Sequence, residues 1–255
     1  MSNLVSIIML ARNKADYAVD SIKSVIAQTY TNWELIFIDD SSTDGTISKV
    51  LESDFNDKRM RFSQFIFEQG ESVTRHKAIF EAKGRWVAFI NCGDLWKPTK
   101  LEEQIAFMES RGCYFSYTKY GIIDSRSNVR KVIIGGPACI NHNDMLKCCW
   151  PGYLTVMYDA SQIKLLTRYK YNDNNDYAIW LEISKQADCY LLDKNLATQR
   201  SDQGLYSPFP FFDRIRWRYN VFIEVEKMNP FVAALMTAQS IWYGIFKKVK
   251  YSSCN

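Results

Sequence analysis

The first part of the chain, up to Ser110, alternates between short apolar runs and segments whose apolar residues recur at helical spacing. Two of the runs, Glu34–Ile38 and Arg85–Asn91, are rich in β-branched and aromatic residues and have the length of buried strands. The predicted strands are Leu4–Met9, Glu34–Ile38, Met60–Phe65 and Arg85–Asn91, and the predicted helices are Val19–Ile26, a short segment from Thr46, Ser72–Ala82 and Lys100–Ser110. Asn13 is expected to cap the first helix. This alternation predicts a mostly parallel sheet with helices on both faces.

Beyond Cys113 the alternation is less regular. Two extended runs, Tyr114–Thr118 and Val129–Ile134, flank a turn-like segment at Asp124–Asn128. The other predicted elements are helices at Asn141–Cys149 and Asp176–Gln186, extended segments at Thr155–Tyr158, Cys189–Leu192 and Leu196–Arg200, and a turn at Cys92–Lys97. Ser201–Pro210 is polar and contains Gly and Pro, so we expect it to be a linker to the last part of the chain.

The composition is that of a folded globular protein. The chain has 255 residues, of which 47% are hydrophobic and 24% charged, enough for one large domain or two small ones. Its net charge of +4 lies in residues 205–255, which hold seven Lys and Arg against three Asp and Glu. A neutral body with a basic, aromatic tail favours a membrane surface or a protein partner over nucleic acid.

The cysteines and the apolar stretches disfavour further classes. Seven cysteines occur without a CxxC pair and with only two histidines, so we expect reduced core thiols and no zinc site. The N-terminus lacks the pattern of a signal peptide. The longest apolar stretch, Phe231–Phe246, is shorter than the ~20 residues of a spanning helix. These patterns predict a cytoplasmic protein.

Two adjacent carboxylates, Asp39 and Asp40, follow the predicted strand Glu34–Ile38 and open a turn rich in Ser, Thr, Asp and Gly. Ligands of open α/β sheets bind beyond the carboxyl ends of the strands. Carboxylates at such a place are costly unless a ligand, a cation or backbone N–H groups meet them. This turn is therefore the first candidate for a binding site.

Four segments, in the same order, resemble the family 2 glycosyltransferases of the GT-A fold: VSIIMLARNKADY, SVIAQTYTNWELIFIDDSSTDGT, AKGRWVAFINCGDLWKPTKLEEQ and NDYAIWLEISK. The resemblance is greatest to bacterial enzymes of capsule, teichuronic acid and O-antigen synthesis. It implies inverting transfer of a sugar from a nucleotide diphosphate, with UDP favoured, to an acceptor hydroxyl. It also implies a GT-A domain at 1–204, with a nucleotide-binding half at about 1–112 and an acceptor half at about 113–204, and a helical tail at 205–255.

The resemblance implies that several residues contact the nucleotide-sugar donor. Asp39 matches the carboxylate that accepts the N3–H of uracil, which suits an ionised group that only accepts hydrogen bonds. Asp40 either helps to order the nucleotide pocket or satisfies backbone N–H groups of its turn. Arg12 stands where relatives have Tyr, and it either contacts the base or a phosphate or lies in solvent. Arg75 and Arg200 match arginines that approach the diphosphate, although Arg75 equally fits the surface of an amphipathic helix.

The metal-binding motif of the family is altered here. Relatives read Asp-x-Asp-Asp where this chain reads Asn91-Cys92-Gly93-Asp94. Asn91 can still contact the ribose, but Gly93 replaces the Asp that binds Mn²⁺ or Mg²⁺, and hard cations need oxygen ligands. Asp94 either serves such a cation or caps the following helix. The resemblance thus implies a divalent cation, whereas the residues at 91–94 argue against a cation site. In the absence of a cation, Arg75, Arg200 or Lys97 would offset the diphosphate charge.

Asn175–Leu181 matches the segment that carries the general base in the family. Its acidic residue is retained as Asp176, and an inverting transfer needs one carboxylate to accept the proton of the acceptor hydroxyl. The alternative for Asp176 is a helix N-cap. Trp150 and Tyr153 match the segment that lines the acceptor side in relatives, where they either stack on a sugar ring or belong to the core.

The tail interleaves aromatic residues with Lys and Arg, as interfacial amphipathic helices do. We expect it to dock peripherally on the inner leaflet, where a polyprenyl-diphosphate-linked saccharide acceptor is found; the alternative is packing on the domain or on a second subunit. The alternative function is a non-catalytic relative that binds nucleotide sugars. A dehydrogenase is disfavoured because no GxGxxG follows the first strand, and a receiver domain because a later acceptor Asp and Lys are not placed correctly.

Overall fold

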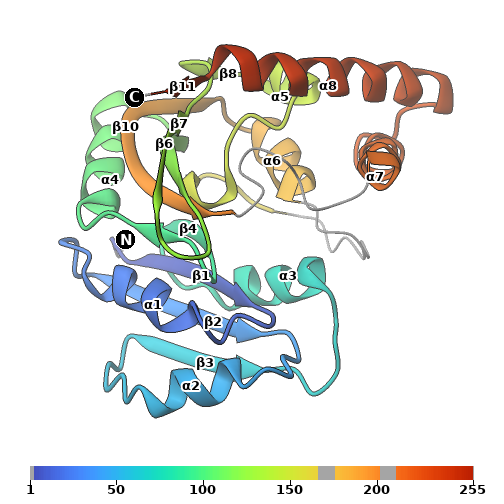
Figure 1. The fold of residues 1–255 in the computed structure, drawn as a ribbon. Helices are drawn as coiled ribbons and strands as arrows, with labels where there is room; N and C mark the ends of the chain where they lie inside the picture. Colours follow the sequence, from blue (N-terminus) through green and yellow to red (C-terminus); the bar gives the residue numbers. More distant parts are fainter. Residues whose placement is uncertain (1–2, 166–175, 202–210, 255) are drawn as a thin grey trace.

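A mixed sheet runs through the middle of the molecule and helices cover both of its faces (Figure 1). The computed structural model describes residues 3–165, 176–201 and 211–254. The strands are β1 (Val5–Ala11), β2 (Trp33–Asp39), β3 (Met60–Gln64), β4 (Trp86–Asn91), β5 (Leu95–Trp96), β6 (Phe115–Ile123), β7 (Val129–Ile134), β8 (Cys139–Ile140), β9 (Met157–Asp159), β10 (Cys189–Arg200) and β11 (Ser252–Cys254). The helices are α1 (Ala18–Ile26), α2 (Thr46–Glu52), α3 (Glu71–Glu81), α4 (Lys100–Arg111), α5 (His142–Lys147), α6 (Asp176–Ser184), α7 (Phe211–Glu224) and α8 (Pro230–Lys250), with a 3₁₀ turn η1 (Tyr153–Thr155). The predicted α/β class is confirmed.

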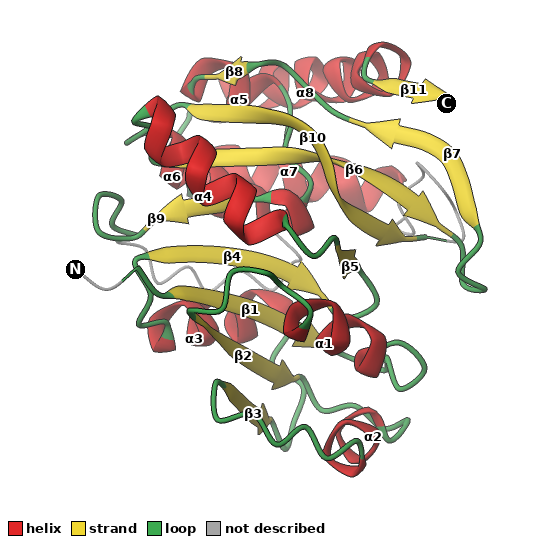
Figure 2. Ribbon diagram, turned by 90° about the vertical axis from the view of Figure 1, so that its left-hand side faces the viewer, coloured by secondary structure: helices red, strands yellow, loops and turns green. Residues whose placement is uncertain are grey.

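Alternate side chains of the central strands build the two faces of the sheet. In β1, Ile7 and Met9 join the core under α1, α2 and α4, whereas Ile8 and Leu10 join the core under α3 and the later helices. Figure 2 shows α1 and α4 in front of the sheet and α3 and α7 behind it. Because both faces are covered, every residue of β1 is buried, which explains why Ser6 is its only polar residue.

The amino-terminal half of the sheet is parallel, in the order β4-β1-β2-β3, so these four strands end at one edge. The register places Asp39 beside Ala11 of β1 and Gln64 of β3. On the other side of β1, Asn91 lies beside Leu10. The turn after β2 and the turn after β4 therefore lie close together at this edge.

The carboxyl-terminal half differs from the prediction in its strands. The two segments predicted at Cys189–Leu192 and Leu196–Arg200 form the single strand β10, because irregularities in the register with β6 let the chain bend while it stays paired. The turn predicted at Cys92–Lys97 contains β5, which pairs with β10. The prediction of a cap at Asn13 was wrong, since its side chain accepts the N–H of Thr43 instead.

The tail forms two helices and one strand. α7 packs on α8, and β11 pairs with β7 at the edge of the main sheet (Figure 1). The predicted helical extension is confirmed, but no pattern in the sequence predicted β11. The predicted linker Ser201–Pro210 lies, apart from Ser201, outside the described residues. In the part of the chain that the structure describes, no helix combines the length and the hydropathy needed to cross a bilayer.

Candidate active site

Asp39 lies at the end of β2, and only one of its two carboxylate oxygens accepts hydrogen bonds from the described part of the chain. Oδ1 accepts the backbone N–H of Ser42 at 2.8 Å and the side-chain amide of Gln64 at 3.2 Å. Oδ2 is buried and accepts no hydrogen bond from any described residue. A buried acceptor without a donor is unfavourable, so this oxygen is suited to a ligand that brings an N–H group.

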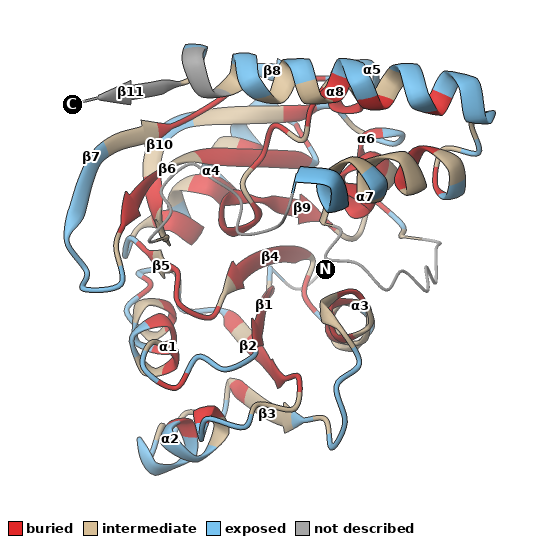
Figure 3. Ribbon diagram, turned by 45° about the vertical axis from the view of Figure 1, so that its right-hand side comes forward, coloured by how far each residue is buried: buried red, intermediate tan, exposed pale blue. Residues whose placement is uncertain are grey.

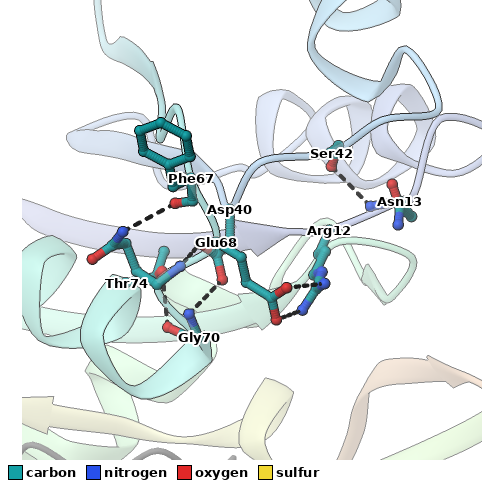
Figure 4. A network of polar contacts seen from close by, with 9 residues as sticks. Arg12, Asn13, Asp40, Ser42, Phe67, Glu68, Gly70 and Thr74 are labelled. Atoms are coloured by element: carbon teal, nitrogen blue, oxygen red, sulfur yellow. Dashed lines mark hydrogen bonds and ion pairs between the residues drawn. The ribbon is translucent and has the colours of Figure 1, made fainter.

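Asp40 holds the loop that precedes α3. Its Oδ1 accepts the N–H of Gln69 at 2.8 Å and its Oδ2 accepts the N–H of Gly70 at 2.9 Å (Figure 4). The sequence left two roles open for Asp40, and these contacts correspond to the second, in which it accepts backbone N–H groups. The N–H groups belong to a neighbouring loop and not to the turn that contains Asp40. Gly70 has a φ of +85°, a conformation that favours glycine and directs the chain into α3.

Arg12 forms a bidentate ion pair with Glu68 across this edge (Figure 4). Both side chains are about half exposed. Nearby, the N–H of Asn13 donates to Ser42 Oγ at 2.8 Å, which connects the loop after β1 to the turn after β2. The guanidinium of Arg12 is therefore already engaged by a residue that the sequence analysis did not single out.

Arg75 and Asp176 meet although they come from different halves of the chain. Arg75 Nη2 lies 2.7 Å from Asp176 Oδ1 and 3.4 Å from Glu71 Oε2. The Arg75 guanidinium carbon lies 4.6 Å from the centre of the Tyr153 ring. Arg75 is only 2% exposed, so it is not a surface residue of an amphipathic helix, as one alternative had it. Its Nε has no hydrogen-bond partner among the described residues.

The Asp176 carboxylate combines a fixed position with access to solvent. It stands at the start of α6, and 30% of its side chain is exposed. Burial raises its pKa, and the positive charge of Arg75 opposes that rise. A carboxylate with a raised pKa, held by one ion pair and reachable from solvent, has the properties of a general base.

The turn after β4 is closed by Arg200 from the end of β10. The backbone N–H of Arg200 donates to Asp94 Oδ1 at 3.0 Å, and its Nε donates to the carbonyl oxygen of Gly93 at 3.1 Å. Its Nη1 donates to the carbonyl oxygen of Asp124 at 3.1 Å, and its Cζ lies 4.4 Å from the centre of the Tyr17 ring. Asp94 does not cap a helix, since α4 begins only at Lys100.

The residues of this turn do not fit a divalent cation. Gly93 offers no side chain, and its φ of +112° disfavours any residue that could offer one. Asp94 Oδ2 is shielded from solvent and accepts no hydrogen bond from any described residue. Burial raises the pKa of Asp94 to about 7, although the Arg200 N–H and the charges of Lys14 and Arg200 act to lower it. Elsewhere too, residues 3–165, 176–201 and 211–254 contain no cluster of three or more His, Cys, Asp or Glu that could hold a metal.

The two residues predicted on the acceptor side have different surroundings. Trp150 is buried, donates its indole N–H to the carbonyl oxygen of Asp144 at 2.9 Å, and makes edge contacts with Tyr243 and Tyr251. These contacts correspond to the alternative that assigned Trp150 to the core. Tyr153 is also buried, but it lies directly under Arg75, beside the candidate base.

Three residues of this site carried no signal that the sequence analysis used. Gln64 contacts Asp39, Glu68 pairs with Arg12, and Glu71 pairs with Arg75. Glu71 and Arg75 are four positions apart, a spacing that predicts a contact on a helix, so this pair could have been found. The other two contacts join different strands and loops and depend on the tertiary structure.

Comparison with known proteins agrees with the predicted family. The family model for "Glycosyl transferase family 2" matches residues 6–153. TuaG of Bacillus subtilis, described as a teichuronic acid biosynthesis glycosyltransferase, is 35% identical over 198 residues, which are 77% of this chain and 79% of TuaG. WfgD of Escherichia coli, a UDP-Glc:alpha-D-GlcNAc-diphosphoundecaprenol beta-1,3-glucosyltransferase, is 39% identical over 182 residues, or 71% of this chain and 70% of WfgD.

Solved structures extend the comparison to the whole fold. S. aureus TarS 1–349, crystallised with UDP, matches with a TM-score of 0.69 and 18% identity over 96% of this chain and 73% of that chain. At this identity the likeness shows the fold, and it confirms the predicted GT-A architecture. With a family model over more than half of its length and relatives aligned over most of theirs, the chain belongs to glycosyl transferase family 2 and is a glycosyltransferase of the GT-A fold.

Proposed function

We propose that the protein transfers a sugar, with inversion, from a UDP-sugar to a hydroxyl of a polyprenyl-diphosphate-linked saccharide during synthesis of a bacterial surface polysaccharide such as O-antigen or capsule. The observation that carries this proposal is the Asp176 carboxylate, partly exposed and held 2.7 Å from a buried Arg75. Such an inverting transfer needs one carboxylate in a fixed position that can accept a proton.

In this reaction Asp176 accepts the proton of the acceptor hydroxyl while the oxygen attacks the anomeric carbon and the nucleoside diphosphate leaves from the opposite side. Burial raises the pKa of Asp176 and so makes it a stronger base than an exposed Asp. Arg75 keeps the carboxylate in one orientation and limits the rise in its pKa. Tyr153 packs on the other side of the guanidinium and restricts its movement.

The donor would be recognised at the other end of the site. Asp39 Oδ2, which accepts no hydrogen bond from a described residue, suits the imide N–H of uracil. Asn91 at the end of β4 would meet the ribose. The name of WfgD states a UDP-sugar donor and a diphosphoundecaprenol acceptor, which supports the same substrate classes for this chain.

The diphosphate charge would be offset by cationic side chains, because the turn at 91–94 lacks a ligand set for Mn²⁺ or Mg²⁺. Arg200 is fixed in that turn and Arg75 lies beside the base, so both are candidates for this role, and Arg12 is a third. We propose further that the protein acts in the cytoplasm, peripherally on the inner face of the plasma membrane, where lipid-linked acceptors of this kind lie. We propose no role in nucleic-acid binding.

The test compares wild type with Asp176→Asn in a transfer assay with UDP-sugars and an undecaprenyl-diphosphate-linked N-acetylglucosamine acceptor. We expect kcat to fall by about 100-fold or more, the contribution of a general base, while UDP still stabilises the variant against heat. Asp193→Asn, which removes an exposed carboxylate away from the site, should retain full activity.

A wild-type protein that binds UDP but transfers no sugar would instead support the non-catalytic alternative. Full activity of Asp176→Asn would refute the assignment of the base.

A further inference from the structure

Helix α8 buries two hydroxyl side chains and turns several large apolar residues outward. Its buried positions include Thr237 and Ser240. Its exposed large apolar residues are Phe231, Val232, Leu235, Trp242, Ile245 and Phe246. Phe231 and Trp242 are 74% and 71% exposed, and Figure 3 shows pale blue along the outer side of this helix. A helix that only stabilised a water-soluble domain would have the opposite arrangement.

The charges of α7 and α8 are mostly positive, although Asp213 and Glu224 of α7 are also exposed. Pro230–Phe246 contains no charged residue, and the lysines of α8 follow at its end, where Lys250 is exposed. On α7, which packs against α8, Arg214 and Arg216 are exposed next to further exposed phenylalanines. The whole tail carries the net positive charge of the chain, while the remaining residues are neutral. An apolar surface bordered by cations is complementary to a bilayer that contains anionic lipids.

We propose that α8 lies flat on the surface of an anionic bilayer, with its outer apolar face among the headgroups and acyl chains and with Lys250 against the phosphates. At 1.5 Å per residue the 21-residue helix would contact the membrane over a length of about 30 Å. Trp242, on the outer face, belongs to a residue type that gathers at the membrane interface. A second copy of the chain is a poorer occupant, because a symmetric dimer would bring two positively charged tails together.

The attachment of α8 links this surface to the acceptor side of the site. Lys247 Nζ donates to the carbonyl oxygens of Cys149 and Trp150 at 3.1 and 2.7 Å. Tyr243 contacts the Trp150 ring, and the chain runs from there to Tyr153 beneath Arg75. If the acceptor is lipid-linked, a point that rests on the proposed function, docking through α8 would present this side of the site to the lipid.

The experiment measures binding of the full chain to vesicles of phosphatidylcholine with and without phosphatidylglycerol, free of acceptor and nucleotide. Wild type should sediment with the anionic vesicles. The double variant Trp242→Gln/Phe246→Gln should bind at least about tenfold more weakly. The matched control Phe80→Gln/Leu51→Gln removes exposed apolar surface from α3 and α2 and should bind like wild type. Circular dichroism and thermal unfolding verify that all variants fold.

Two results would overturn the proposal: wild type that fails to bind anionic vesicles, or equal loss of binding in the two double variants. Sedimentation velocity adds a third: wild type is a dimer, the α8 double variant is a monomer, and adding vesicles does not change the wild-type dimer. A second copy of the chain would then cover the outer face of α8. These readouts need no transferase activity, so they are separate from a failure of the proposed function. With a soluble acceptor, the α8 variant should retain the wild-type kcat.

Discussion

Replacing Asp94 by Asn should abolish a loss of stability that the wild-type protein suffers as the pH rises. Burial raises the pKa of Asp94 to about 7 in the folded protein, whereas an Asp in an unfolded chain has a pKa of about 3.9. Between these values the folded state keeps a proton that the unfolded state has released, so the free energy of unfolding falls with rising pH. The stabilising contribution is complete below the unfolded pKa and is lost as the pH rises through the folded pKa.

The size of the effect follows from the shift. One pKa unit corresponds to about 1.4 kcal/mol, so the whole shift amounts to ~4 kcal/mol, of which ~3 kcal/mol falls between about pH 5 and about pH 8. Asn at this position keeps an oxygen for the N–H of Arg200, which donates to Asp94 Oδ1 at 3.0 Å. It has no proton to release, so the stability of the variant relative to wild type should increase by ~3 kcal/mol across this range.

Urea unfolding at the two pH values measures this difference. Asp40→Asn is the control, the same type of substitution at another buried carboxylate. Both Asp40 oxygens accept backbone N–H groups. In the variant an amide nitrogen would face one of these N–H groups, so the free energy of unfolding should fall by ~1–3 kcal/mol. Equal pH dependence in wild type and Asp94→Asn would refute the reasoning. So would a Mn²⁺-dependent gain in UDP binding that Asp94→Asn abolishes, because the carboxylate would then be an accessible metal ligand.

Two further substitutions test the packing around the site. Gly93→Ala should lower the free energy of unfolding by ~1–3 kcal/mol through backbone strain alone, since the nearest atom to the new Cβ is 3.9 Å away at Tyr17; an unchanged urea midpoint would contradict this. Burial lowers the pKa of Lys100 to about 7, so wild-type stability should rise between about pH 7 and about pH 10 as the unfolded state alone holds the proton. Lys100→Met should remove that rise. At neutral pH its free energy of unfolding should exceed that of wild type by ~2 kcal/mol, a value that allows for the lost hydrogen bond to Gln104. A variant less stable than wild type at pH 7 would count against this.

The amino-terminal half of the fold could be predicted because local signals and the tertiary structure agree there. A parallel strand buried on both faces has a nearly continuous apolar sequence, and β1, β2 and β4 all come close to it. The position of Asp39 and Asp40 after such a strand was enough to predict a site at the edge of the sheet. The strands after Cys113 were harder, because bulges and short pairings such as β5 with β10 depend on partners distant in the chain.

Most contacts within the site could not be predicted. Arg75 and Asp176 meet through the packing of α3 and α6, and Arg200 reaches Asp94 only because β10 runs alongside β6 and β5. Burial, and with it the raised pKa of Asp94, is likewise a property of the assembled fold.

The sequence by itself determined the α/β class, the glycosyltransferase family and the edge of the sheet at which the carboxylates gather, because strand burial and motif order are written in local patterns. Only the tertiary structure decided which side of α8 faces solvent, since that helix is apolar almost all round and its orientation is set by the surface on which it packs. For the same reason only the folded chain could show that Asp40 holds a loop and that Gly93 adopts a φ of +112°.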